Sequence, residues 1–137
     1  MSILVKEAEI IEEFELFEEW TEKYEYLIDL GRALPLIKEE LKTEEYLIHG
    51  CQSQVWLNAE LKEGKVFYKA DSDAQIPKGI VSLLVRVLSD ESPEEIVKTE
   101  LSFIDQIGLK EHLSPTRSNG LVSMVKQMKM FALAFQS

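Results

Sequence analysis

The chain has 137 residues, of which 45% are hydrophobic and 9% aromatic, and its net charge at neutral pH is −10. This length fits a single domain, residues 1–137, with a core large enough to need neither disulfides nor metals, and the composition excludes a disordered protein. No apolar run approaches the roughly 18 residues of a membrane-spanning helix, and no cluster of basic residues offers a surface for nucleic acid.

The first third of the chain is strongly acidic, because residues 1–45 hold 14 acidic residues and only 5 Lys or Arg. Helical spacing of apolar residues predicts one helix over 5–17 and a second over 18–31, which ends near Gly31. Residues 35–45 are predicted as a loop or a short helical turn. The acidic residues are expected to form a solvated face, and the alternative is a surface that steers a basic partner.

The middle of the chain is rich in β-branched and aromatic residues and predicts three antiparallel strands. These are "EYLIHG" (45–50), "SQVWLNAEL" (53–61) and "KVFYKAD" (65–71). The short segment "KEGK" suits a hairpin turn at Gly64 between the last two strands. Alternation in the second strand predicts two faces, with Val55, Leu57 and Ala59 on one and Trp56 and Asn58 on the other.

Helical spacing returns after residue 75 and predicts a central buried helix that ends near Leu88, with Pro77 in its first turn. A short helix capped by Ser92 covers 92–97, and another ends at Gly108. A last helix is expected over 115–135, capped by Ser114. The predicted fold class is therefore α+β, a small three-stranded antiparallel sheet with helices packed on one side.

Cys51 is the only cysteine of the chain and stands in the segment "HGCQSQVWL". A free cysteine is commonly buried as a small hydrophobe. Gly50 before it and the polar run from Gln52 to Gln54 instead indicate a loop tip between two strands, where reactive side chains are often displayed. A core thiol and a thiol presented for chemistry both remain open at this point.

Two other roles for Cys51 are a ligand in a metal site and the nucleophile of a cysteine–histidine hydrolase. Zinc sites use about four ligands, and here Cys51, His49 and either Asp71 or Asp73 could converge, without any spacing signature. A hydrolase needs an imidazole within reach of the sulfur and a third group that orients it. Both histidines, His49 and His112, are expected to be surface or capping residues instead.

The segment "HLSPTRSNG" (112–120) predicts the start of the last helix, with Ser114 as its cap. Arg117 falls in the first turn, where a cation opposes the helix dipole, so it is a candidate for another purpose. A helix N-terminus favours anions such as a thiolate or a persulfide. The segment is therefore a candidate neighbour of Cys51.

Several segments, taken together, resemble the SufE family of sulfur-acceptor proteins, and they follow the family's order over nearly the whole chain. The central "GCQSQVW" is highly specific to that family. The matching segments are "YLIDLGRALP" (26–35), "HGCQSQVWL" (49–57), "ADSDAQIPKGI" (70–80), "SPEEIV" (92–97) and "GLKEHLSPTRSNGL" (108–121).

The resemblance implies a role in iron–sulfur cluster assembly. In that role a SufS-like cysteine desulfurase holds sulfur as a persulfide, and the SufE-like protein accepts this sulfur, stimulates the desulfurase and delivers the sulfur to a SufBCD-like scaffold. The position that matches the acceptor is Cys51. Pyridoxal phosphate belongs to the desulfurase, so neither a cofactor nor a metal is expected on this chain. The family's α+β fold is shared with IscU-type scaffolds, which use several cysteines to hold a cluster.

The resemblance also suggests supporting residues around the acceptor. Arg117 is expected to stabilise the thiolate or the docked loop, and Asp73 to anchor the loop or contact the partner. Gln52 and Gln54 are expected to hold the loop backbone, and His49 flanks it. Ordinary capping and turn roles remain the alternative for these positions.

The sequence leaves two other functions open, and it also leaves open a different recipient for the sulfur. One is a standalone cysteine-nucleophile thioesterase or acyl hydrolase, and another is an interaction module whose cysteine is incidental. The sulfur recipient could also lie outside the main cluster scaffold. The lone cysteine and the absence of a signal-peptide pattern lead us to expect a cytoplasmic protein. A homo-oligomer is neither indicated nor excluded.

Overall fold

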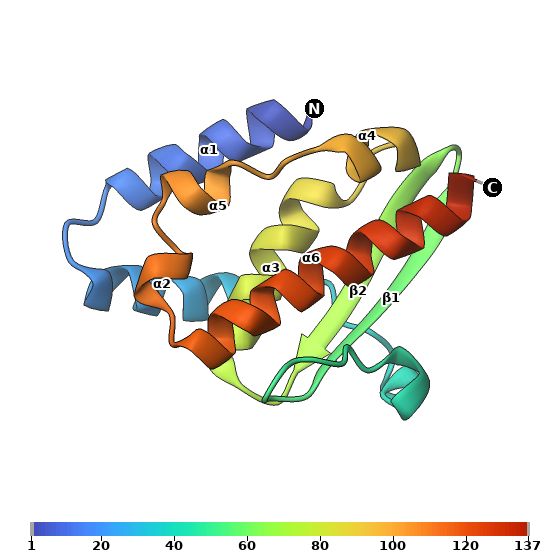
Figure 1. Cartoon of the computed structure of the whole chain (residues 1–137), viewed down its shortest axis with the longest axis horizontal. Coiled ribbons are helices and arrows are strands. Elements are labelled where there is room, and N and C mark those ends of the chain that lie inside the picture. Colours follow the sequence, from blue (N-terminus) through green and yellow to red (C-terminus); the bar gives the residue numbers. More distant parts are fainter. Residues whose placement is uncertain (1, 137) are drawn as a thin grey trace.

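The computed structural model describes residues 2–136, and within that range helices precede and follow a single β-hairpin (Figure 1). The fold class is α+β, as predicted. None of the helices in the described range has the length and apolar character that crossing a membrane requires. The elements are α1 (Ile3–Glu15), α2 (Trp20–Gly31), β1 (Val55–Lys62), β2 (Lys65–Ser72), α3 (Gln75–Leu88), α4 (Pro93–Lys98), α5 (Phe103–Gln106) and α6 (Pro115–Gln136), with short 3-10 turns η1 (Glu39–Leu41), η2 (Glu44–Tyr46) and η3 (Lys110–His112).

The hairpin turns at Glu63 and Gly64, whose φ angles are 51° and 79°. Its two faces are those predicted from the alternation: Val55 and Leu57 are buried, whereas Trp56 and Asn58 are only partly covered. Helices α3 and α6 pack against the buried face. In Figure 1, α6 crosses the hairpin and its C-terminal end lies beside the hairpin turn.

The sheet has two strands, so the prediction of three was wrong. The segment predicted as the first strand, 45–50, makes one isolated bridge, between Leu47 and Trp56. Its first residues belong to the 3-10 turn η2, where Leu47 N donates to Glu44 O at 3.3 Å. Only Ile48 N bonds across to β1, donating to Val55 O at 2.8 Å, before Gly50 turns the chain away, so the pairing ends after one bridge.

Short segments outside the sheet occupy the free edge of β2. At one end, Ala70 N donates to Pro35 O at 3.0 Å, and at the other, Val66 N donates to Glu91 O at 2.9 Å. Between them, Tyr68 N donates to the hydroxyl of Ser89 at 2.8 Å. The edge is therefore closed to a further strand.

Helix α3 lies at the centre of the core, as predicted, and ten of its 14 residues are buried. It crosses α2 very closely at Gly79, where a Cβ atom would lie only 2.2 Å from Leu27 O. Only glycine fits at that crossing. Because α3 also contacts β2, α6 and α1, it fixes the scaffold that carries the loop around Cys51.

The remaining helices are close to their predicted ranges. Helix α1 begins and ends two residues before the predicted limits, because the hydroxyl of Ser2 accepts the N–H of Val5 and caps it. The hydroxyls of Ser92 and Ser114 accept N–H groups at the starts of α4 and α6, as expected. Gly108 has a φ of 72° just after α5.

Candidate functional site

Cys51 lies in the loop between Ile48 and β1, and this loop rests against α6. Gly50 takes a φ of 97°, which side chains other than glycine rarely adopt. A Cβ atom on Gly50 would lie 2.4 Å from the hydroxyl oxygen of Ser123. The glycine thus permits both the turn and the close approach of the loop to the helix.

The thiol of Cys51 is half-buried and points at the backbone of α6. Its Sγ lies 3.6 Å from Gly120 O, to which the S–H donates a weak hydrogen bond. Burial raises the pKa of the thiol above its ordinary value. A carbonyl acceptor also favours the protonated form, so Cys51 rests as a neutral thiol in this conformation.

A small cavity of about 70 Å³ adjoins the sulfur. It has polar residues from the loop and from the first turns of α6, and apolar residues from α3 and α6. The space is small enough to suit one or two atoms bound to the cysteine rather than a separate organic substrate. The lining residues are Cys51, Gln52, Ser53, Pro77, Ile80, Thr116, Arg117, Gly120 and Met124.

Reciprocal hydrogen bonds hold the exit of the loop to the end of β2. The carboxylate of Asp73 accepts Gln54 N at 3.1 Å, and Asp73 N donates to Gln54 O at 3.2 Å. The hydroxyl of Ser72 donates to the same carbonyl at 2.8 Å. One end of the loop is therefore fixed, and it is the main chain of Gln54 that makes these bonds.

Next to these hydrogen bonds, the buried carboxylate of Asp71 forms ion pairs with two lysines. Its oxygens lie 2.6 Å from Lys42 Nζ and 3.3 Å from Lys78 Nζ, and it accepts Ser72 N at 2.8 Å. Burial alone would raise the pKa of Asp71, but the hydrogen bonds from Lys42, Ser72 and Lys78 outweigh it and hold the pKa below the ordinary value. This cluster ties the segment before the loop to the start of α3.

The sequence-derived candidates divide into three groups in space. Gln52 and Arg117 line the cavity beside Cys51, although the side chain of Arg117 is largely exposed. Asp73 lies at the loop exit and contacts the backbone of Gln54. His49 is exposed and is absent from the cavity lining.

Neither histidine is placed to act as a base for Cys51. The ring of His112 stacks on Trp20, with centroids 4.0 Å apart, and its Nδ1 lies 2.9 Å from Gly108 O. Neither His112 nor His49 lines the cavity. Within residues 2–136, no three His, Cys, Asp or Glu side chains lie close enough together to hold a metal ion.

Several residues around the thiol were not identified from the sequence. The sequence places Pro77 in the first turn of α3, and Ile80 and Met124 have the spacing of ordinary buried residues of α3 and α6. Gly120 was seen only as the end of a segment. A glycine inside a helical pattern is costly and usually has a packing reason. A Cβ atom on Gly120 would lie 3.4 Å from Cys51 Sγ. The glycine in the helix was therefore the one sequence feature that could have indicated a contact with the thiol.

Comparison with known proteins identifies the family of this chain. The family profile described as SufE, Fe-S metabolism associated domain, matches residues 8–132. An uncharacterized SufE-like protein of Synechocystis sp. is 41% identical over 129 residues, which cover 94% of this chain and 81% of that protein. An uncharacterized SufE-like protein of Rhizobium meliloti is 36% identical over 126 residues, 88% of this chain and 90% of that protein.

A solved structure has the same fold. The solution structure of a hypothetical protein from Thermus thermophilus superposes with a TM-score of 0.78 and covers 96% of this chain and 97% of its own. At 24% identity, this likeness concerns the fold alone.

Proposed function

The chain belongs to the SufE family, and we propose that it is a sulfur acceptor that takes persulfide sulfur from a cysteine desulfurase onto Cys51. The observation that carries the proposal is the state of Cys51. It is a single thiol on a loop, bonded to a carbonyl beside a cavity of about 70 Å³, and no histidine lines that cavity. Such a thiol is suited to receive an atom from a partner rather than to hydrolyse a bound substrate.

The transfer itself needs only thiol–disulfide chemistry. Cys51 loses its proton, and its thiolate attacks the outer sulfur of the desulfurase persulfide. The sulfur–sulfur bond of the donor breaks, and the donor cysteine leaves as a thiolate. The new bond joins the transferred sulfur to Cys51. Because the chain has one cysteine, no second thiol of its own can attack this persulfide and release the sulfur.

The loop alternates between a sheltered and an exposed state in this proposal. In the sheltered state burial holds the pKa of Cys51 high and its S–H donates a hydrogen bond to Gly120 O, which keeps the thiol unreactive. The loop swings out to meet the desulfurase and then returns. On return, the cavity between Pro77, Ile80 and Met124 holds the outer sulfur away from oxidants and other thiols.

The neighbouring residues have supporting roles. Arg117, at the cavity and near the start of α6, supplies positive potential for the thiolate or the persulfide anion. Asp73 fixes the loop exit through the backbone of Gln54, so that only the tip moves. Gln52 lines the cavity and contacts the bound sulfur, and His49 lies on the exposed side that meets the partner.

The partners follow from the family's chemistry. The donor is a SufS-like cysteine desulfurase, which holds the pyridoxal phosphate, and the recipient is a SufBCD-like scaffold. Delivery to a recipient outside that scaffold is the alternative. The protein works in the cytoplasm in this proposal, and it carries the sulfur without a bound cofactor.

The stimulation of a desulfurase tests the proposed function. The desulfurase is assayed with cysteine, with and without this protein, and the sulfide released after reduction is measured. The native protein is expected to raise turnover, and the Cys51→Ser variant to lose that effect while its melting temperature stays unchanged. The matched control is Thr43→Ser, an exposed position outside the cavity lining, which should stimulate as the native protein does.

Undiminished stimulation by the folded Cys51→Ser variant would contradict the proposal. So would hydrolysis of an acyl thioester by the native protein alone, because that activity belongs to a hydrolase.

A further inference from the structure

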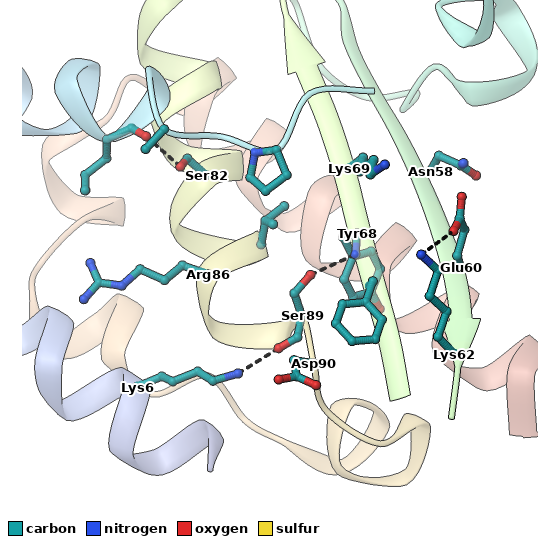
Figure 2. A pocket seen from close by; sticks show the side chains of 15 residues that line it. Lys6, Asn58, Glu60, Lys62, Tyr68, Lys69, Ser82, Arg86, Ser89 and Asp90 are labelled. Carbon is teal, nitrogen blue, oxygen red and sulfur yellow. Dashed lines mark hydrogen bonds and ion pairs between the residues drawn. The ribbon is translucent and has the colours of Figure 1, made fainter. Parts of the chain in front are cut away.

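A groove of about 790 Å³ lies on the side of β2 that faces away from α6, and it shares no lining residue with the cavity at Cys51 (Figure 2). Its walls come from the second half of α3, from the residues after α2, and from the exposed face of the hairpin. A volume of this size is typical of sites for small organic ligands. Neither the proposed sulfur transfer nor the comparisons account for it.

The base of the groove is mainly apolar. Pro35 and Phe67 line it from the chain after α2 and from β2, and Val85 lines it from α3. Phe67 is half-buried although it lies on the exposed face of the hairpin. An apolar body bound there would remove these surfaces from water.

Most of the cations along the groove already form ion pairs with acidic residues. Lys6 pairs with Glu91 at 2.6 Å, Arg86 with Glu13 at 2.5 Å, and Lys62 with Glu60 at 3.5 Å. The pair of Glu60 and Lys62 is visible in Figure 2.

Lys69 differs from the other cations of the groove, because it forms no ion pair in the part of the chain that the structure describes. It stands directly opposite Asn58 in the strand register, and both residues line the groove (Figure 2). The two acids of the groove lining are paired with other lysines, Glu60 with Lys62 at 3.5 Å and Asp90 with Lys65 at 3.9 Å. The ammonium of Lys69 and the amide of Asn58 are thus neighbouring donors that can bind an anion.

An extended peptide does not suit this groove. The N–H groups on the free edge of β2 are already used: those of Val66 and Ala70 donate to neighbouring backbone, and that of Tyr68 to Ser89 Oγ. A peptide added as a strand would find no free donors there. The geometry therefore favours a compact ligand that lies across the apolar base.

We infer that this groove binds a small amphipathic anion, with its apolar body over Pro35, Phe67 and Val85 and its anionic head at Lys69 and Asn58. The inference is independent of Cys51 and of sulfur transfer. A carboxylate and a phosphate monoester share the required chemistry, so the head group is decided by experiment.

The test is a titration of the 15N-labelled protein with octanoate, octyl phosphate and neutral 1-octanol, followed by amide NMR shifts. We expect saturable shifts confined to residues 30–34, 58–62, 67–69 and 82–90, with at least one of the two anions bound more tightly than the alcohol. The variant Lys69→Gln is expected to weaken anion binding about fivefold, the factor that about 1 kcal/mol represents, and to leave 1-octanol unaffected.

The matched control is Lys110→Gln, which removes the same charge from an exposed lysine outside the groove lining and should change nothing. The inference is overturned if the anions and the alcohol bind equally, if Lys69→Gln and Lys110→Gln behave alike, or if the shifts lie elsewhere. It is also overturned if no shift saturates at millimolar concentration. Because the native protein gives the shift map, a poorly folded variant cannot obscure the result.

Discussion

At the scale of single residues, the behaviour of Cys51 follows from its surroundings. Burial raises its pKa, and its S–H donates a weak hydrogen bond to the carbonyl of Gly120 at an Sγ to oxygen distance of 3.6 Å. The thiolate is the reactive form of cysteine. The free protein therefore keeps this thiol in its unreactive, protonated form.

The pH dependence of alkylation tests this state. Because burial raises the pKa of Cys51, its thiolate forms at higher pH in the folded protein than in the unfolded chain. We expect the rate with iodoacetamide to rise at correspondingly higher pH for the native protein than in urea. A bulky maleimide should react more slowly still. Equal pH profiles for the folded and unfolded chains, or equal rates for small and bulky reagents, would contradict a sheltered thiol.

Gly50 provides a second test at residue scale. A Gly50→Ala change meets both a φ of 97° and the hydroxyl of Ser123 at 2.4 Å, so the closed loop should lose about 1–3 kcal/mol. Alkylation of Cys51 should then become at least about tenfold faster, since about 1.4 kcal/mol corresponds to a factor of ten. The measurement is the alkylation rate beside the melting temperature.

The matched control for Gly50 is Gly64→Ala. Gly64 has a φ of 79°, but a Cβ there would meet nothing within 4 Å. This variant carries the backbone strain without the clash, and it lies in the hairpin turn. If it accelerated alkylation of Cys51 as much as Gly50→Ala does, the contact between the loop and Ser123 would not hold the loop closed.

At the scale of elements, Asp71 joins three segments: the chain around η1, the end of β2 and the first turn of α3. Replacing it by Asn removes charge-assisted bonds to Lys42 and Lys78 and should lower the free energy of unfolding by about 2 kcal/mol at neutral pH. The exposed pair of Asp29 and Arg32 offers a control, because Asp29→Asn should cost under about 0.5 kcal/mol.

The contribution of Asp71 should also depend on pH in a defined direction. Its folded pKa is lower than in the unfolded chain, so its stabilisation is complete above the ordinary carboxyl pKa and is lost as the pH falls through the folded value. Denaturant unfolding of the native protein and of Asp71→Asn should thus converge in acid. A gap between them that stayed constant down to low pH would show that Asp71 is not stabilised as a carboxylate.

The sequence predicted most elements because their signals are local. The central helix α3 followed from apolar spacing, and the starts of α4 and α6 followed from Ser92 and Ser114, which cap them as expected. The prediction of a third strand was wrong because segment 45–50 pairs with β1 at a single bridge, between Leu47 and Trp56. Strand propensity describes a residue's fit to a sheet but not whether a partner strand reaches it.

The sequence predicted where Cys51 lies but not what surrounds it. Gly50 and the polar run from Gln52 to Gln54 indicated a loop, which the structure has, but the wall of the cavity comes from α3 and α6, far along the chain. Pro77 and Met124 carry no signal that distinguishes a cavity wall from ordinary core. Their roles depend on how the helices cross, and the close approach at Gly79 sets one of these crossings.

At the scale of the whole molecule, the fold separates two sites by a single helix. Pro77 and Ile80, in the first half of α3, line the cavity at Cys51, whereas the groove uses the half from Ser82 onward. The central helix thus gives the loop around Cys51 a fixed support, which the proposed sulfur transfer requires.

The central claim is that Cys51 receives sulfur from another protein, and mass spectrometry of the intact chain measures this most directly. The protein is incubated with a cysteine desulfurase, pyridoxal phosphate and cysteine, and then digested without reductant. The account predicts one added sulfur atom, located on Cys51, reversed by reductant and absent from Cys51→Ser. A chain that gains no sulfur although the desulfurase turns over, or that gains it equally in Cys51→Ser, would contradict the account.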